Sequence, residues 1–421
     1  MIDHAHPTPH PLPRSGWALI VALACASGTG ASLAQTPPPQ KPPGGTSPDL
    51  PIREGSSVRN EDAPTPNQFH LDFNAGARSS SNVFFDPDDG SPQQDYIGTL
   101  VMDLSATRTS PRTAWTMAYV PVLNHYQTYD QLDSTSHAFN YTGRYRLGVR
   151  GGLNLQEHFT LSNDPIIVST PQEGDSPILA NNQRVTRNRA EINMDRELSR
   201  RTRFNIGATH ILNRYEDENF QDSDGLLGLI GLDFAVRRED TLGMSLSGGR
   251  LQFEDDVPDV TSESAALNWS HVQDRSRVEL SGGATVAKQT ETDSFFSGSA
   301  ALYRRFGRNA EFGGGWRRSL TADVGNNGTS VGDRVFMTIS GDAGRHLTLM
   351  ASADYGRRES VAGASEVNLD LWGGSFRARV SMGQRWGLVT GANYRRQETV
   401  QPDIGSQTVN NYYLGITCRA F

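Results

Sequence analysis

The fold class is decided by the stretch Phe69-His70-Leu71-Asp72-Phe73-Asn74-Ala75-Gly76-Ala77-Arg78. Its odd-numbered positions hold apolar or small residues, and its even-numbered positions hold polar residues and one glycine. Because successive side chains of a β-strand point to opposite faces, this alternation predicts a strand with one apolar and one polar face. Comparable alternation occurs within residues 139–149, 242–247, 278–286 and 347–355, and no stretch has the 3.6-residue period of a helix.

The alternating segments are too long for an ordinary soluble β protein. They run for roughly ten to fifteen residues, whereas strands of soluble proteins usually have about five or six. A strand that crosses a membrane needs about nine to eleven residues, with an apolar outside and a polar inside. The sequence therefore predicts an all-β chain in which residues 67–421 form a single antiparallel transmembrane β-barrel of about 18 strands, with about 16 as the alternative count. A secreted β-solenoid is disfavoured because the chain has no fixed short repeat.

Composition fits a barrel with a wet interior. Only 36% of the 421 residues are hydrophobic and the mean hydropathy is -0.52, which is low for soluble domains with their own cores. Half of each membrane strand would face water, so a low apolar content is expected. The net charge of -8 disfavours a general nucleic-acid binder, and beyond the N-terminus the apolar runs are too short for a membrane-spanning helix.

The first residues are typical of an export signal. The apolar run from Trp17 to Ala26 is too short to cross a membrane, and Ser32-Leu33-Ala34 has the small-x-small pattern of a cleavage site. We therefore predict a signal peptide over residues 1–34, with lipidation at Cys25 as the alternative. Residues 35–66 are rich in proline and predict an extended periplasmic tail, either a passive linker or an arm that plugs the pore or binds a partner.

Connections between the predicted strands alternate in length. An even number of strands places both termini on the periplasmic side, so the longer connections would be extracellular. These longer connections cover residues 82–94, 162–183, 213–224, 253–263, 322–333 and 395–408. The shorter periplasmic turns lie around residues 110–111, 198–199, 238–239, 274, 306–307, 342–344 and 382–383.

Charge follows the same division. Acidic residues gather in the longer connections, and arginines gather at the shorter turns. A basic periplasmic mouth would attract an anionic chain, although polar residues also collect in loops without any such role. The acidic loops could meet lipopolysaccharide through divalent cations, but no spacing in them specifies a calcium site. The candidates for the basic mouth are Arg200, Arg201, Arg203, Arg304 and Arg305.

The alternation also predicts which side chains line the lumen. Opposite charges across a pore can select solutes by charge, or can simply keep the wall hydrated. The long connection over residues 162–183 carries Glu173 and Asp175 together with several apolar residues. We predict that it folds into the channel and narrows it, with extension of the flanking strands as the alternative. The candidates for the lumen lining are Arg144, Arg146, Arg187, Arg189, Glu191, Arg377 and Arg379.

The chain ends in Tyr412-Tyr413-Leu414-Gly415-Ile416-Thr417-Cys418-Arg419-Ala420-Phe421. A last strand that ends in phenylalanine resembles the C-terminal strand of bacterial outer-membrane β-barrels. This resemblance implies that the barrel-assembly machinery reads Phe421 as an assembly signal. Arg419 and Thr417 stand where the pattern usually has apolar residues, which leaves the register of the strand's end open.

A narrower resemblance covers the whole chain after the signal. The order of signal peptide, proline-rich tail and a first strand running into Ser81-Asn82-Val83-Phe84 is similar to the β-barrel porins found with exopolysaccharide export systems. This resemblance implies an outer-membrane channel for a secreted polysaccharide, with periplasmic polysaccharide-export proteins as partners. Fold analogy alone cannot decide a function.

Three functions therefore stay open for this barrel. The first is a polysaccharide conduit, and the alternatives are a general or weakly selective solute porin and an adhesive or structural barrel. We expect no enzyme, cofactor or metal site, because the chain has no phosphate-binding loop, no nucleophile elbow and no His-Cys cluster. A protease or phospholipase site assembled from separate strands is the remaining enzymatic alternative. Outer-membrane lipid and lipopolysaccharide would surround the barrel.

Overall fold

The computed structural model describes residues 68–83, 92–163, 184–216, 222–254, 258–307, 309–322, 329–361, 368–383, 385–401 and 405–419. These residues form 18 β-strands and one short 3-10 turn, η1 (Asp130–Leu132). In the described part of the chain, no helix is long and apolar enough to cross a membrane. The strands are β1 (Gln68–Ser80), β2 (Asp95–Thr109), β3 (Thr113–Tyr126), β4 (Ser134–Leu147), β5 (Gly151–Ser162), β6 (Val185–Glu197), β7 (Thr202–Tyr215), β8 (Ser223–Ala235), β9 (Asp240–Phe253), β10 (Val260–Gln273), β11 (Ser276–Lys288), β12 (Thr292–Phe306), β13 (Ala310–Ala322), β14 (Thr329–Ala343), β15 (Leu347–Val361), β16 (Asn368–Met382), β17 (Trp386–Gln401) and β18 (Gly405–Arg419).

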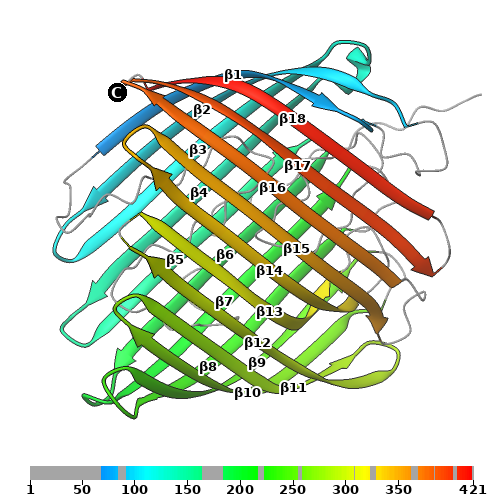
Figure 1. Cartoon of the computed structure of the whole chain (residues 1–421). Helices are drawn as coiled ribbons and strands as arrows, with labels where there is room; N and C mark the ends of the chain where they lie inside the picture. Colours follow the sequence, from blue (N-terminus) through cyan, green and yellow to red (C-terminus); the bar gives the residue numbers. More distant parts are fainter. Residues whose placement is uncertain are drawn as a thin grey trace, which may run out of the picture.

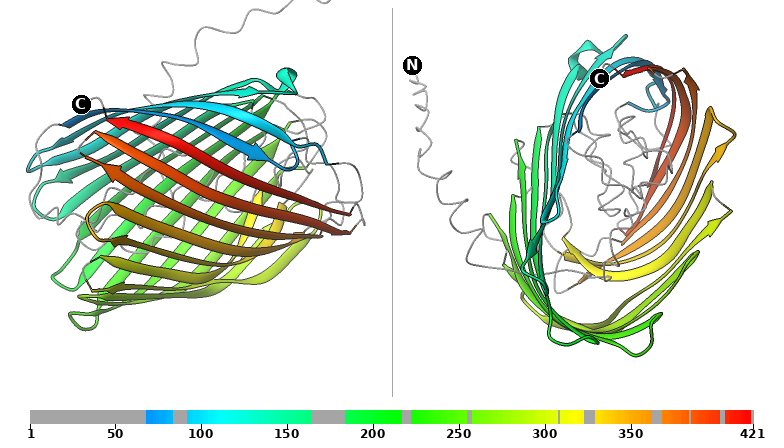
Figure 2. Two further views of the ribbon diagram at one scale, coloured as in Figure 1. Left: turned by 45° about the horizontal axis from the view of Figure 1, so that its top comes forward. Right: turned by 90° about the vertical axis from the view of Figure 1, so that its left-hand side faces the viewer.

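The strands form one closed barrel. Each strand pairs antiparallel with its neighbour in the sequence, and β1 also pairs with β18, so the 18 described strands leave no open edge (Figure 1 and Figure 2). Asp72 of β1 lies opposite Arg419 of β18, which places the start of the first strand and the end of the last strand at the same end of the barrel. The predicted all-β antiparallel barrel of 18 strands is therefore confirmed, and the alternative count of about 16 is wrong.

Eight short turns lie at the end of the barrel where β1 begins, which we call the turn end. Four of them contain a glycine with a positive φ, at Gly148, Gly307, Gly344 and Gly383. Glycine is favoured at these positions because a Cβ would clash with the backbone in this conformation. The alternation did not predict the turn at residues 148–150, between β4 and β5.

The connections at the opposite end, the loop end, differ in length. Residues 81–94 and 163–184 form the two longest, in agreement with the sequence. Others are shorter than predicted, since β17 and β18 take up most of the expected loop 395–408 and β14 begins within the expected loop 322–333. At the loop end, the strands continue beyond the region whose outer face is apolar. Strand residues in this extension are polar and resemble loop residues in composition, so hydrophobic alternation cannot show where the strands end.

The two faces of the wall differ as a membrane barrel requires. Large apolar side chains are exposed on the outer face around the barrel, among them Phe73, Leu100, Leu246, Met337 and Leu414. The opposite face of the strands is mostly polar. Clusters of buried apolar residues in the described part are small and lie near β2–β4: Val101, Val120, Val122 and Ala138, and Val83, Ile97, Tyr126 and Leu132. The barrel therefore depends on backbone pairing between strands rather than on a large apolar core.

Candidate functional site on the inner wall

The candidate site is the inner wall of the barrel, the face opposite the exposed apolar side chains. Strand register places all of the predicted lumen residues on this face. They form two separate groups, because β4–β6 and β16 lie apart around the ring (Figure 1). Their action on a passing solute stays a prediction. The first group is Arg144, Arg146, Arg187, Arg189 and Glu191, and the second is Arg377 and Arg379.

The group on β4–β6 is partly neutralised. Arg189 and Glu191, at successive inward positions of β6, form an ion pair with Nη2 and Oε1 2.7 Å apart. Arg187 is only 8% exposed, whereas Arg144 and Arg146 are exposed. The ion pair between Arg189 and Glu191 reduces the positive charge that a solute would meet beside β6. The unpaired positive charge of the group therefore lies on β4, at Arg144 and Arg146.

Arg377 on β16 is held by a tyrosine on β18. Its Nε donates a hydrogen bond of 2.8 Å to the Tyr413 hydroxyl, and its guanidinium carbon lies 5.8 Å from the centre of the Tyr413 ring. Gly391 lies between them on β17, and a Cβ there would collide with the Tyr413 hydroxyl and the Phe376 carbonyl oxygen. The glycine therefore allows two long side chains to meet across the intervening strand.

Further inward arginines on β13–β18 and β1 add to the β16 group, and together with it they make up what we call the arginine wall. They were not among the predicted lumen residues, although each occupies a polar position of the alternation. The alternation predicts the face on which each residue lies. It does not predict which residues of neighbouring strands lie opposite each other. The added residues are Arg78, Arg317, Arg334, Arg358, Arg395 and Arg419.

The arginine wall carries a net positive charge. Its described inward side chains are eight arginines against four carboxylates, a net charge of +4. Two of the carboxylates pair with wall arginines, Asp354 with Arg334 at 3.6 Å and Asp72 with Arg419 at 3.3 Å. On the described inner face of β2–β12, seven arginines stand against eight carboxylates, a net charge of -1. The carboxylates of the wall are Asp72, Glu311, Asp342 and Asp354.

The lumen is therefore asymmetric across its width. One side carries a surplus of guanidinium charge, with Arg358 and Arg377 only 2% and 9% exposed, and the other side is close to neutral. Such an arrangement produces a transverse field, in which an anion is drawn toward one wall. The arginine wall comprises six consecutive strands, β13–β18, and β1, which closure of the barrel brings beside β18.

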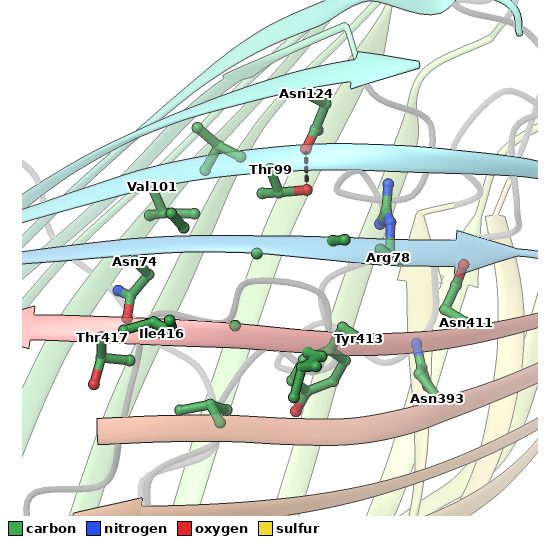
Figure 3. Close-up of a pocket in the computed structure, with 17 residues that line it drawn as sticks. Asn74, Arg78, Thr99, Val101, Asn124, Asn393, Asn411, Tyr413, Ile416 and Thr417 are labelled. Atoms are coloured by element: carbon green, nitrogen blue, oxygen red, sulfur yellow. Dashed lines mark hydrogen bonds between the residues drawn. The ribbon is translucent and has the colours of Figure 1, made fainter. Parts of the chain in front are cut away.

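Neutral polar side chains line the wall where β1 and β18 close the barrel (Figure 3). Gly76 and Gly415 face each other across this seam and leave a recess between longer side chains. The Thr99 hydroxyl donates a hydrogen bond of 2.9 Å to Asn124 Oδ1 beside it. Amides and hydroxyls supply both donors and acceptors to a hydrated solute. The polar residues around the recess are Asn74, Arg78, Thr99, Asn124, Asn393, Asn411, Tyr413 and Thr417.

The predicted mouth residues lie at the turn end. Arg200 and Arg201 belong to the exposed turn between β6 and β7, and Arg203 on β7 lies 3.8 Å from Glu197. Arg305 is on the inner face of β12. Arg304 is on the outer face, where its guanidinium carbon lies 5.4 Å from the centre of the Phe306 ring, so it stands outside the opening.

Arginine is present at nearly every turn of this end. Among their described residues, seven of the eight turns contain at least one. Few carboxylates oppose them, with Glu239 and Asp274 as the acidic turn residues. The turn end is therefore a basic rim. Its described turn arginines are Arg112, Arg150, Arg200, Arg201, Arg237, Arg238, Arg275, Arg345 and Arg385.

Carboxylates at the loop end hold the connections in place. Asp133 accepts a hydrogen bond of 2.7 Å from the Tyr126 backbone N–H and lies 2.7 Å from His125 Nδ1. The hydrogen bond from His125 is the main reason that the pKa of the Asp133 carboxyl lies below its usual value. Likewise, Arg250 Nε donates to Asp259 at 2.9 Å and lowers the pKa of that carboxyl. Among the described connection residues of this end, seven carboxylates stand against one arginine, Arg184, so this end of the barrel is acidic where the turn end is basic.

Several predicted features lie outside the described residues. These are the constriction candidates Glu173 and Asp175, the assembly signal Phe421, and residues 1–66 with Cys25. They stay predictions. Within the described ranges, no group of three or more His, Cys, Asp or Glu side chains is placed to hold a metal ion.

Comparisons with known proteins bear on architecture alone. No family model and no curated protein matches the chain. Among solved structures it is similar to OccAB4 of Acinetobacter baumannii, with 11% identity over 86% of this chain and 100% of that one, at a TM-score of 0.42. It is also similar to OccK2 (OpdF) of Pseudomonas aeruginosa in complex with glucuronate, with 11% identity over 84% and 98% at a TM-score of 0.43. The siderophore receptor PirA of the same species has 9% identity over 85% and 81%, at a TM-score of 0.42. Likenesses this distant assign neither a family nor a function.

Proposed function

We propose that the protein is a bacterial outer-membrane channel for hydrated anionic solutes, with an exported polysaccharide as its cargo. The observation that carries the proposal is the arginine wall, whose net charge of +4 faces a nearly neutral opposite side. Guanidinium groups spread over seven strands attract an anion by distributed charge rather than at one deep site, which suits transit better than retention. A barrel of 18 strands is wide enough for an aqueous lumen.

The outer face supports a membrane location. Bulky apolar side chains such as Phe296, Leu267 and Met337 are 56%, 73% and 56% exposed. A protein surrounded by water does not expose so much contiguous apolar surface, because that exposure costs roughly 25 cal/mol for each Å². Outward charges gather toward the strand ends, where they would reach the two polar borders of a bilayer.

The charge distribution along the axis supports export of an anion. The basic rim at the turn end would raise the local concentration of a polyanion at that opening, and the acidic loop end would repel anions approaching from the other side. A cleaved signal peptide, as predicted, together with the even number of strands would put the turn end in the periplasm. The basic rim would then attract a polyanion from the periplasm, the compartment from which it is exported. A general solute porin is the second candidate, because the arginine wall would serve a small anion as well.

Reversal potentials in planar bilayers test the anion preference. Under a KCl gradient the purified barrel should pass chloride in preference to potassium. Replacing Arg334, Arg358 and Arg395 together by glutamine should reduce this preference, because three charges of the wall are removed. The matched control replaces Arg318 and Arg357, which lie on the outer face of β13 and β15, and should leave selectivity unchanged. Potassium preference in the wild type, or unchanged selectivity in a correctly folded triple variant, would refute the proposal.

Deletion of the gene separates the two cargoes. If the barrel exports a polysaccharide, the deletion strain should lose surface polymer while synthesis continues and polymer collects in the periplasm. Replacing Arg200, Arg201 and Arg203 by glutamine should reduce export, since Arg200 and Arg201 belong to the basic rim and Arg203 lies beside it at the turn end of β7. Normal surface polymer combined with slower uptake of small anions would favour the solute porin instead.

A further inference from the structure

Glu157 places a carboxylate on the outer face of β5. It lies opposite Tyr141 of β4 and Ala190 of β6 in the strand register, and Leu155 and Phe159 are its neighbours on the same face. Its side chain is exposed. Within the described part of the chain, it has neither a hydrogen bond nor an ion pair. The carboxylate therefore interrupts a surface that is otherwise apolar at this place.

No other described strand has a charged outward side chain at this height. Glu157 is the seventh residue of β5 counted from the turn end. Elsewhere, outward charges either lie within three residues of the turn end, as at Arg196 and Arg304, or begin at the ninth residue, as at His210 and Arg318. Because about nine to eleven residues cross a bilayer, the seventh residue lies at hydrocarbon depth.

A carboxylate at hydrocarbon depth needs a hydrogen-bonding partner. Lipid tails have neither donors nor acceptors, and ionisable residues inside membranes usually pair with one another or face a polar cavity. Glu157 does not face the lumen, and no described residue of its own barrel pairs with it. Lipid headgroups lie too far toward the membrane surfaces to reach it. A protein surface beside the barrel is the remaining source of a donor.

The outer surface around Glu157 is suited to close contact with protein. Ala190 beside it carries only a methyl group, so another backbone can approach there, whereas Gly143 on β4 is covered by the side chains of Tyr141 and Tyr145, whose hydroxyls bond to each other. Asn188 lies on the same face of β6, and its amide oxygen is buried without a hydrogen bond among the described residues. His210 of β7, about 10 Å from Glu157 by strand spacing, is engaged with Asp224, since its Nε2 lies 3.0 Å from Asp224 Oδ1.

We propose that this patch, defined by Glu157, Asn188 and Ala190, is the interface with a second copy of the chain in the plane of the membrane. The patch contains an unpaired acceptor, the Glu157 carboxylate, and a donor of its own, the Asn188 amide N–H. Rotational symmetry places the same patch on both copies, so the Glu157 carboxylate of one copy meets a donor of the other. Two copies of this chain are enough to give the Glu157 carboxylate of each copy a hydrogen-bond donor, so a different partner protein is not required.

The mass of the assembly in mild detergent tests the interface. Wild-type protein should be a multimer by light scattering, and Glu157→Leu should raise its dissociation constant at least tenfold. Leu246→Ala is the matched control, because Leu246 is the seventh residue of β9 on the outer face at another side of the barrel. It should remain a multimer. The Glu157→Leu barrel itself should resist heating at least as well as the wild type, because leucine suits lipid better than glutamate does.

Disulfide trapping gives a second measurement that does not require Glu157 to be changed. In a Cys418→Ser background, Phe159→Cys should form a covalent dimer under mild oxidation, and Met244→Cys on β9 should not. A wild-type protein that is monomeric at all concentrations would overturn the proposal. A Glu157→Leu variant that associates as tightly as the wild type, or a multimer without trapping at Phe159, would overturn it as well. None of these results depends on ion selectivity, so they are separate from the test of the channel function.

Discussion

Gly76 of β1 lies directly opposite Gly415 of β18 at the seam where the barrel closes. A Cβ added to Gly76 would lie 2.7 Å from the Leu414 carbonyl oxygen and 3.1 Å from the Gly415 Cα. The two backbones are therefore nearer than a pair of residues with side chains would allow. This seam joins the first and last described strands, so its contacts form between distant parts of the sequence. Closure of the barrel depends on this approach.

Replacing Gly76 by alanine should weaken the seam. The added methyl group would force β1 away from β18, and overpacking of this kind typically costs about 1–3 kcal/mol. The control is Gly98→Ala on β2, where the nearest atom to an added Cβ is the His125 carbonyl oxygen at 3.8 Å. Urea unfolding of the refolded barrel, followed by tryptophan fluorescence, gives the free energy of unfolding of each variant. Equal losses in the two variants would mean that the seam has no special need for glycine.

The contact between Arg377 and Tyr413 should contribute measurably to stability. Tyr413→Phe removes the acceptor of the 2.8 Å hydrogen bond and leaves the Arg377 Nε with one fewer partner. Loss of a hydrogen bond to a charged group costs about 1.5–3 kcal/mol. Tyr412→Phe is the matched control, because Tyr412 is the adjacent residue on the outer face and is 60% exposed. If both phenylalanine variants unfold alike, the hydrogen bond has no net effect on stability.

Much of the architecture could be predicted from alternation alone. The stretch from Phe69 to Arg78 and its counterparts identify the strands, their inner and outer faces and their approximate number, because period two is a local property. Strand ends were predicted less well. β17 and β18 extend into the expected loop 395–408. This extension was not predicted because strand residues beyond the bilayer are polar on both faces and show no hydrophobic alternation. The turn at Gly148 was missed because one glycine gives a weak signal.

The site was predicted in pieces. Arg377 and Arg379 were found from their positions in one strand, but the wall they belong to also needs Arg78 and Arg358, which other strands supply. That assembly follows from register and closure, which no local pattern contains. Glu157 was visible in the sequence, standing at an apolar position between Leu155 and Phe159. Its significance appears only when every other outward strand position at that height proves uncharged in the described barrel.

The anchor of the connection between β3 and β4 should depend on pH. The pKa of Asp133 is lowered in the folded protein, so its carboxylate contributes stability that is present above the unfolded pKa of about 3.9 and is lost as pH falls through the folded pKa. Asp133→Asn should therefore reduce the free energy of unfolding by more at pH 6 than at pH 3. Asp130→Asn, in the same connection, controls for loss of a negative charge. A loss that is the same at both pH values would contradict this account.

Labelling of intact cells should show which end of the barrel faces outward. β1 begins and β18 ends at the turn end, and the predicted signal peptide would deliver the chain to the periplasm, so we expect the loop end to face the medium. In a Cys418→Ser background, Glu291→Cys at the loop end should react with an impermeant thiol reagent, and Arg201→Cys at the turn end should react only after the outer membrane is permeabilised. Both positions are exposed, so access from the medium is the only difference measured. Reversed labelling would place the basic rim outside the cell. The axial charge distribution would then attract anions from the medium, and uptake would replace export as the direction that it favours.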